Sequence, residues 1–232
     1  MSATVRRGNG TWAPWTERVG LAVLWAGVSV VIWAAYRWAP AAGGFPGESS
    51  RIVFFHVPLA FVSFLSFLVA TGYAVAYLAR GRLVHDESSA GAAGLGLLFC
   101  VLTTITGAIF SRRAWGAYWN WDPRQTSILV VLMIYGAYFA LRSAVDRPEK
   151  RAALSSVYVI LAFTTLPFLF FVLPRITLSL HPSDTLSPAN PGMDAPTLRV
   201  FAASAAAHLA LFAALLNTRI RVARLETAPT ES

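Results

Sequence analysis

Long apolar segments separated by shorter polar segments dominate the chain. Six apolar segments can be marked, at 19–38, 52–78, 91–110, 126–141, 152–173 and 200–216. A helix needs about 20 predominantly apolar residues to cross a bilayer, with a range of about 17 to 25. Pro58, near the start of the second segment, predicts that a helix begins or kinks there. The pattern predicts an all-α membrane protein in which residues 1–232 form a single bundle of six transmembrane helices.

The composition agrees with a membrane protein and argues against nucleic acid as a partner. Hydrophobic residues make up 56% and charged residues 13% of the chain, whereas ordinary soluble domains carry roughly 25% charged residues. The net charge of +8 would suit nucleic acid, but the basic residues flank the apolar segments, as membrane orientation requires. We therefore expect a lipid bilayer and no nucleic acid. Cys100 lies inside an apolar segment and is expected to be a packing residue.

The distribution of basic residues predicts how the bundle is oriented. Of the 19 Lys and Arg residues, 12 fall on one side of the predicted membrane and the remaining seven on the other. The positive-inside rule makes the first side cytoplasmic, so both termini are expected in the cytoplasm. The outer side then carries the segments 111–124 and 174–196. On the cytoplasmic side we expect a loop from Arg80 to Ala90, and no cleavable signal peptide is evident before the first span.

The outer segment 111–124 is unusually aromatic. It contains the string Trp115-Gly116-Ala117-Tyr118-Trp119-Asn120-Trp121-Asp122. Such a density of rings predicts a flat aromatic surface with a polar edge, suited to a large planar ligand. The alternative is an ordinary aromatic belt at the membrane surface. Asp122 precedes Pro123 and can either cap the N-terminus of the fourth helix or contact a ligand, and the sequence leaves both roles open.

The four histidines divide into two pairs. His85 falls in the predicted cytoplasmic loop and is expected to be solvated there. His208 lies midway through the sixth predicted helix; an intramembrane histidine can be functional, but we favour a packing histidine bonded to a neighbouring helix. His56 begins the second helix and His181 lies in the outer segment 174–196, so both project to the face that carries the tryptophans. This shared face makes His56 and His181 candidate axial ligands of a haem iron.

The other residues on this face suit haem as well. Haem is a flat apolar macrocycle with an iron centre and two carboxylates, and aromatic rings supply apolar contact to it. Arginine binds carboxylates through a bidentate fork. Arg51, five residues before His56, and Arg124, two residues after Asp122, are expected to face the haem propionates. Binding of lipid headgroups is the alternative role for both arginines.

At these residues the chain resembles a known family. The string from Trp115 to Asp122 is similar to the tryptophan-rich WWD motif of haem-handling proteins. Within that group, the chain resembles the haem exporter protein C (CcmC) family of the cytochrome c maturation pathway in residues 51–58, which include Arg51 and His56, and in residues 106–110. The resemblance covers nearly the whole chain, from the first predicted helix to the sixth.

The resemblance implies a function, partners and a location. Proteins of this family hold haem b at the outer surface of the cytoplasmic (inner) membrane and load it onto a periplasmic haem chaperone (CcmE), without enzymatic activity of their own. They act with a small membrane protein (CcmD) and an ABC transporter (CcmA and CcmB). The same roles carry over here to His56 and His181 as axial ligands and to Trp115, Trp119, Trp121 and Asp122 as the aromatic platform. Tyr118 stands where many members have another Trp, and it keeps the aromatic ring.

Two other functions fit parts of the pattern. A membrane b-type cytochrome in electron transfer needs ligand histidines inside helices, and only His208 lies there in the prediction. A related WWD-type cytochrome c synthase is, by family resemblance, larger and carries further intramembrane histidines. A small-solute transporter would show internal repeats or broken helices around a midplane site, which we do not find. The sequence therefore favours haem handling and delivery.

Overall fold

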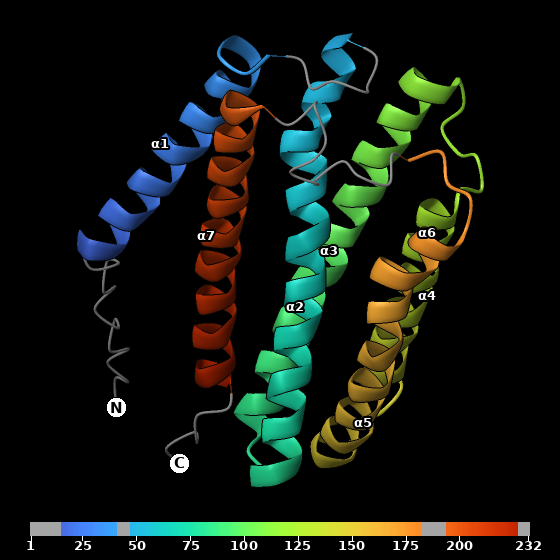
Figure 1. The fold of residues 1–232 in the computed structure, drawn as a ribbon. Coiled ribbons are helices and arrows are strands. Elements are labelled where there is room, and N and C mark those ends of the chain that lie inside the picture. Colours follow the sequence, from blue (N-terminus) through green and yellow to red (C-terminus); the bar gives the residue numbers. More distant parts are fainter. Residues whose placement is uncertain (1–14, 41–46, 182–193, 227–232) are drawn as a thin grey trace, which may run out of the picture.

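The chain folds into a bundle of antiparallel helices (Figure 1). The structure is a computed structural model and describes residues 15–40, 47–181 and 194–226. Within these ranges every regular element is helical, and six helical stretches are long and apolar enough to cross a membrane. The predictions of an all-α fold and of six spans are therefore confirmed. The elements are α1 (Trp15–Arg37), the short 3₁₀ helix η1 (Gly47–Ile52), α2 (Val53–Arg80), α3 (Leu83–Trp115), α4 (Pro123–Ser143), α5 (Pro148–Pro167), the π-helix η2 (Phe168–Val172), α6 (Leu173–Ile176) and α7 (Ala195–Glu226).

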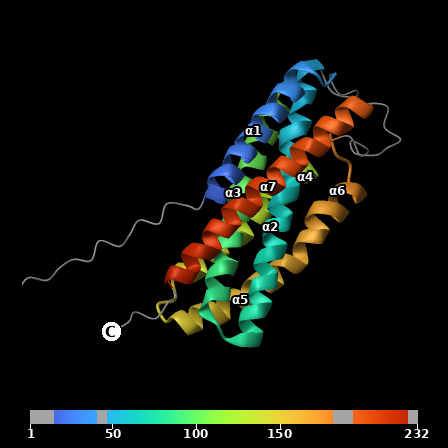
Figure 2. The ribbon, with the colours of Figure 1, turned by 90° about the vertical axis from the view of Figure 1, so that its left-hand side faces the viewer.

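The antiparallel course of the helices gives the bundle two distinct ends (Figures 1 and 2). One end comprises the upper ends of the helices in Figure 1: the start of α2, the end of α3 and the starts of α7 and α4, with α6 beside the start of α4. We call it the histidine end, because His56 and His181 belong to these segments. The lower end gathers the end of α2, the start of α3, the end of α4 and the start of α5. We call it the Asp86 end, after a buried residue of α3.

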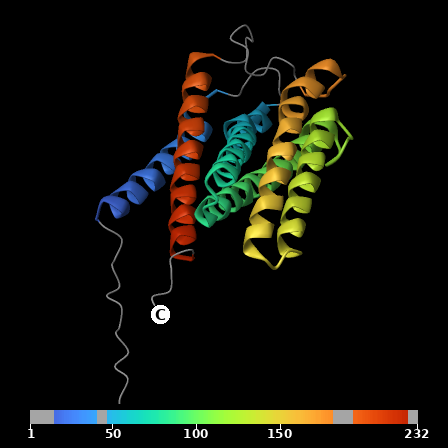
Figure 3. The ribbon, with the colours of Figure 1, turned by 90° about the horizontal axis from the view of Figure 1, so that it is seen from below.

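Seen from below, the helices lie in a row of pairs (Figure 3). Helices α2 and α3 occupy the middle, α1 and α7 lie on one side of them, and α4 and α5 lie on the other. Small residues bring the central pair together. A methyl group added at Gly96 of α3 would lie 2.5 Å from the Phe67 ring of α2, and the Ser63 hydroxyl donates to the Gly96 carbonyl at 2.9 Å. Close packing through small residues and interhelical hydrogen bonds is typical of membrane helices.

The start of α3 differs from the sequence prediction. We expected a loop from Arg80 to Ala90, but only Gly81 and Arg82 lie between α2 and α3. The polar residues that predicted a loop are helical because they find partners: buried Asp86 forms an ion pair with Arg142 of α4, with Nη1 and Oδ1 2.5 Å apart. His85 is also helical rather than a solvated loop residue, and its ring stacks on Tyr73 with centroids 6.4 Å apart.

Two prolines shape the fifth span. Pro167 ends α5 and Pro174 lies in α6, and a proline inside a helix removes a backbone hydrogen bond. Between them the chain forms one π-helical turn, in which the Leu173 N–H donates to the Phe168 carbonyl, five residues earlier. The helical stretch thereby continues from Pro148 to Ile176. Its last turns form one wall of the site described next.

Candidate functional site

A cavity of about 290 Å³ lies at the histidine end, between α2, α3, α4 and the η2–α6 segment. Small-molecule sites usually measure about 300–1,000 Å³, so this cavity falls at the lower edge of that range. Its lining is mostly apolar, with Phe61, Phe110, Phe170 and Phe171 among the aromatic residues. Two of the four histidines, His56 and His181, both line it. The structure therefore brings together the two histidines that the sequence singled out, from segments more than 100 residues apart.

His56 presents one defined ring nitrogen for ligand binding. Its Nδ1 lies 3.0 Å from the Thr106 hydroxyl oxygen of α3. The single proton of that hydroxyl is already donated to backbone carbonyls, at 2.8 Å for Leu102 and 3.1 Å for Thr103. The hydroxyl oxygen therefore accepts a hydrogen from Nδ1 of His56, which assigns the proton of the neutral ring to that nitrogen. The lone pair on Nε2 is then left for a ligand, as in metal-binding histidines oriented by a second partner.

Gly107 lets the imidazole of His56 lie directly against α3. A methyl group built at Gly107 would lie 2.9 Å from Cε1 of His56 and 3.7 Å from its Nε2. A contact of 2.9 Å is too short for carbon atoms, so any larger residue would displace the ring. In the sequence, Thr106 and Gly107 stand out only as members of residues 106–110, which carry part of the family resemblance. The structure gives them a reason: one fixes the tautomer of His56, and the other makes room for its ring.

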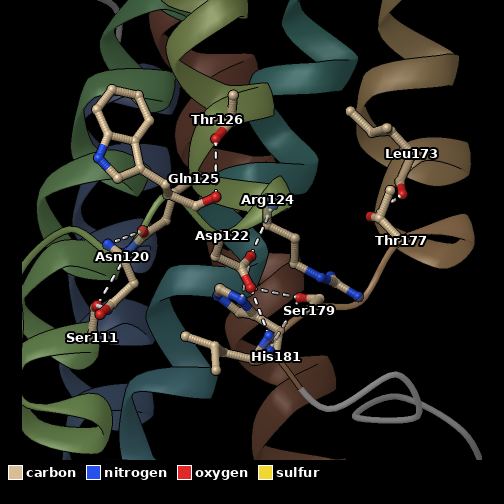
Figure 4. Close-up of polar contacts among 12 residues, drawn as sticks. Ser111, Asn120, Asp122, Arg124, Gln125, Thr126, Leu173, Thr177, Ser179 and His181 are labelled. Carbon is tan, nitrogen blue, oxygen red and sulfur yellow. Dashed lines mark hydrogen bonds and ion pairs between the residues drawn. The ribbon is translucent and has the colours of Figure 1, made fainter.

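Asp122 caps a helix, which is one of the two roles that the sequence left open, and it also holds His181 (Figure 4). Its Oδ1 accepts from the backbone N–H of Arg124 at 2.9 Å, which caps α4, and lies 3.0 Å from Nδ1 of His181. Its Oδ2 accepts from the Ser179 hydroxyl at 2.9 Å and from the Leu180 N–H at 2.6 Å. Four donors thus converge on one buried carboxylate. They tie the segment after α6 to the start of α4.

These contacts fix the charge state of both groups. Burial favours the neutral acid, but the N–H groups of Arg124 and Leu180, together with His181 and Ser179, hold the pKa of Asp122 below its usual value. Burial lowers the pKa of His181, and it outweighs the opposing effect of the Asp122 carboxylate. His181 is therefore neutral at neutral pH, donates from Nδ1 to the carboxylate, and keeps the Nε2 lone pair free. Neutral imidazole is the form that binds metals.

The aromatic string contacts His181 through Trp115 and does not form the predicted flat surface. Trp115, the last residue of α3, lies edge-on to the His181 ring with centroids 4.9 Å apart. Trp119 lines the cavity, and its ring is nearly perpendicular to that of Trp121, at 89°. The prediction of one flat surface was wrong because the chain turns sharply at Gly116 (φ 83°) and at Trp121 (φ 55°). A positive φ is strained for a bulky residue, and such strain occurs mainly at functional sites.

A polar network that could not be predicted from the sequence holds this loop in place. The Ser111 hydroxyl donates to the Ala117 carbonyl at 2.7 Å and accepts from Asn120 Nδ2 at 2.7 Å. The Gln125 side chain accepts from the Asn120 N–H at 2.8 Å and donates to Ser111 at 3.1 Å. Figure 4 shows Ser111 and Asn120 side by side, linked across the loop. The exposed rings of Tyr118 and Trp121 are thus carried on a rigid turn.

The two predicted propionate ligands lie in different surroundings. Arg124 lines the cavity, and its Nε is buried with no hydrogen-bond partner in the described part of the chain. Arg51 is not among the lining residues. Its guanidinium binds Glu48 and donates to the carbonyls of Ala35 and Ala39, at 2.5 and 2.7 Å, so that it closes the C-terminus of α1. Arg175 of α6, which the sequence did not single out, lines the cavity instead.

His208 lies outside the cavity lining and has a partner. Its Nδ1 lies 2.8 Å from the Ser204 carbonyl, one turn earlier on α7. The expected packing histidine is therefore bonded to its own helix rather than to a neighbouring one. Cys100 is a free, buried thiol, as a packing residue would be.

Comparison with known proteins points to one family. The sequence model of the family described as Heme exporter protein C (CcmC) matches residues 2–231. The chain is 28% identical to Heme exporter protein C of Rhodobacter capsulatus over 184 residues, which cover 77% of this chain and 72% of that protein. It is 29% identical to the Escherichia coli K12 protein of the same name over 162 residues, with 70% and 64% covered. It is 35% identical to the Paracoccus denitrificans protein over 111 residues, which span 48% of this chain and less than half (46%) of that protein.

Proposed function

The chain belongs to the haem exporter protein C (CcmC) family, a family of multi-pass membrane proteins that handle haem in cytochrome c maturation, and from this premise we propose that it binds haem between His56 and His181. In this proposal the bound haem is haem b, and the protein delivers it to the periplasmic chaperone CcmE. The protein acts as a haem carrier and has no catalytic step of its own. CcmD and the ABC transporter CcmA–CcmB are the other proposed partners.

One observation carries the proposal: the two histidines line one cavity, and each has its Nδ1 occupied. His56 donates to Thr106 and His181 donates to Asp122, at 3.0 Å in both cases. Both rings therefore offer Nε2, from α2 and from the segment after α6. A carboxylate or hydroxyl behind the ring fixes the tautomer and raises the basicity of a metal-binding imidazole. A pair of neutral imidazoles is a common axial ligand set for haem iron.

The size and lining of the cavity fit part of a haem and leave the rest accessible. At about 290 Å³ the cavity is small for so large a planar ligand. In the proposal the aromatic and aliphatic lining contacts one part of the macrocycle, and Trp119 continues that surface toward the exposed Trp121. Arg124 is the proposed partner of a propionate, with Arg175 beside it. The contacts of Arg51 favour a structural role at α1, and its predicted propionate contact stays a prediction.

An accessible haem edge suits transfer to a partner protein. The rings of Tyr118 and Trp121 are 62% and 71% exposed at the histidine end, and exposed aromatic rings are enriched at protein interfaces. We propose that CcmE docks over Trp115–Asp122, and that this end faces the periplasm while both termini lie in the cytoplasm. Reporter fusions after Asp122 and after Lys150 should then report opposite sides of the inner membrane.

The absorption spectrum of the purified full-length protein tests the haem site. The expected result is a bound haem with two imidazole ligands, lost when either His56 or His181 is changed to Ala and partly restored by added imidazole. The matched control is His85→Ala, because His85 lies at the Asp86 end and should leave the spectrum unchanged. A double His56→Ala and His181→Ala variant with normal haem content and a normal spectrum would remove the proposal.

A further inference from the structure

The start of α2 contains a backbone carbonyl whose regular helical donor is missing. In an α-helix each carbonyl accepts from the N–H four residues later. For Phe54 that residue is Pro58, which lies inside α2 and has no N–H. Phe54 is fully buried, so solvent cannot supply the missing donor. Inside a membrane such groups must be satisfied by a neighbouring helix, often through a Ser or Thr side chain.

Ser204 of α7 supplies that donor. Its hydroxyl, which is fully buried, donates to the Phe54 carbonyl. His208, one turn later on α7, directs its Nδ1 to the Ser204 carbonyl at 2.8 Å, and the Ser204 hydroxyl oxygen lies farther away at 3.4 Å. The single hydroxyl proton of Ser204 is therefore used on Phe54. Val200, one turn earlier, packs against Phe54 in the same buried cluster and keeps α7 in register with α2.

The same turn of α2 carries His56. Residues two apart on a helix point in directions about 200° apart, and here Phe54 packs against Val200 of α7 while His56 contacts Thr106 of α3. The first turn of α2 is thus held between two helices. Thr106 and Gly107 hold the imidazole on one side, and Ser204 holds the backbone on the other. Without a hydrogen-bond donor for the Phe54 carbonyl, this turn of α2 could shift relative to α3.

We propose that Ser204 is a positioning residue for His56: its hydroxyl replaces the N–H that Pro58 removes, and so fixes the turn that presents the His56 imidazole to the cavity. This inference rests on the proposed function, because it concerns a histidine that is proposed to bind haem. It also explains why α7 contributes to the site although no residue of α7 lines the cavity within the described part of the chain.

The pairing of Ser204 with Pro58 makes the proposal testable by a double-mutant cycle in the full-length protein. Ser204→Ala removes the hydroxyl, and Pro58→Ala restores the backbone N–H for Phe54. We expect Ser204→Ala to weaken haem affinity about tenfold and to add a component to the spectrum that resembles the His56→Ala variant. In the Pro58→Ala background the same change should cost less than about twofold, because Phe54 then has its own donor.

Ser66→Ala is the matched control. Ser66 is also a buried serine, and its hydroxyl donates to the Val62 carbonyl at 2.7 Å within α2, where the Ser66 N–H is itself a regular helical donor. Its loss should leave the haem spectrum unchanged. If Ser204→Ala does not fold alone, the double variant decides: haem binding at the level of Pro58→Ala supports the role of Ser204, and loss of binding in the double variant overturns it.

An equal loss for Ser204→Ala in both backgrounds would also overturn the proposal, as would a wild-type spectrum and affinity in the single variant. Failure of the proposed function looks different. In that case the wild-type chain would show no histidine-dependent haem spectrum, while melting temperatures of the same four proteins would still show the coupling between Pro58 and Ser204.

Discussion

Both ends of the bundle contain a buried aspartate that binds a basic side chain, but the contacts have different consequences for the side chains around them. At the Asp86 end, Arg142 binds both oxygens of Asp86, at 2.5 and 3.0 Å, and also reaches Glu87 at 3.3 Å. Arg151 of α5 binds Glu87 at 2.9 Å. The charges satisfy one another and tie α3, α4 and α5 together. At the histidine end, Asp122 and Thr106 each satisfy one nitrogen of a histidine and leave the other free.

Burial and hydrogen bonding alone therefore do not identify the site. Asp86 and Asp122 are both buried, at 1% and 4% exposed, and both hold a basic side chain. Both ends leave polar atoms over, since Nε2 of His85 and Nε of Arg151 at the Asp86 end are buried without a partner in the described part of the chain. Neither of those residues lines the cavity at the histidine end, whereas His56, His181 and Arg124 all line it, and the buried Nε of Arg124 has no described partner. Polar side chains that converge on one cavity distinguish the candidate site from a structural cluster.

The largest expected difference between variants at the two ends is in the free energy of unfolding. Arg142→Leu leaves the buried Asp86 carboxylate unpaired, which should cost about 3–5 kcal/mol of unfolding free energy. Haem affinity of the folded fraction should stay at the wild-type value, because no residue of this network lines the cavity. Unfolding in detergent and haem titration measure the two effects. The double variant Asp86→Leu and Arg142→Leu should recover part of the unfolding free energy. Weaker haem binding by the refolded double variant would show that the Asp86 end also affects the haem site.

Asp122→Asn should show the reverse pattern. Asn caps a helix about as well as Asp, but an amide has one acceptor oxygen for the four donors that now share the carboxylate. The cap on α4 can survive while the His181 segment loses its anchor. We expect haem affinity to fall about 10- to 100-fold, the usual range for a lost partner of a metal ligand. The melting temperature should change little, and unchanged affinity would mean that Asp122 is only a cap.

The fold was largely predictable because hydropathy is a local property. All six spans follow from runs of apolar residues, whereas α2 begins at Val53, so that Pro58 lies inside the helix and does not begin it. The start of α3 was not predictable. The charged residues around Asp86 indicate a loop when they are viewed locally, and they are helical only because Arg142 and Arg151 arrive from α4 and α5.

The residue types of the candidate site could be predicted from the sequence, but the residues that orient them could not. His56, His181 and Asp122 stand out because such residues are rare beside apolar segments. The partners that orient them come from distant positions: Thr106 lies 50 residues from His56 and Ser179 lies 57 residues from Asp122. Arg51 has contacts that the sequence did not suggest. Its guanidinium donates to the carbonyls of Ala35 and Ala39, and its predicted ligand contact stays a prediction.

Gly107→Ala tests the histidine end by filling the space next to the His56 ring, without removing a hydrogen bond. The added methyl group would meet Cε1 of His56 at 2.9 Å and should push the imidazole out of position. Haem affinity is expected to drop about tenfold, at the lower end of the effects of such supporting residues. Gly72→Ala on α2 is the matched control, since a methyl group there meets nothing within 4 Å. Equal haem affinities for the two variants would show that the ring of His56 tolerates movement.

The smallest expected effect is on haem affinity, and it should differ between Arg124→Ala and Arg51→Ala. Arg124 lines the cavity with a buried, unpartnered Nε, whereas Arg51 is bound to Glu48 and to α1. A charged hydrogen bond at a partly hydrated edge orients a ligand more than it holds it, so Arg124→Ala should weaken haem binding by up to about tenfold. Binding of haem with esterified propionates should not change. Arg51→Ala should weaken both ligands equally, because it loosens the end of α1 beside the first turn of α2. If Arg51→Ala weakened the binding of free haem and not of esterified haem, Arg51 would be a propionate ligand after all. If Arg124→Ala weakened the binding of both ligands equally, Arg124 would be a structural residue like Arg142.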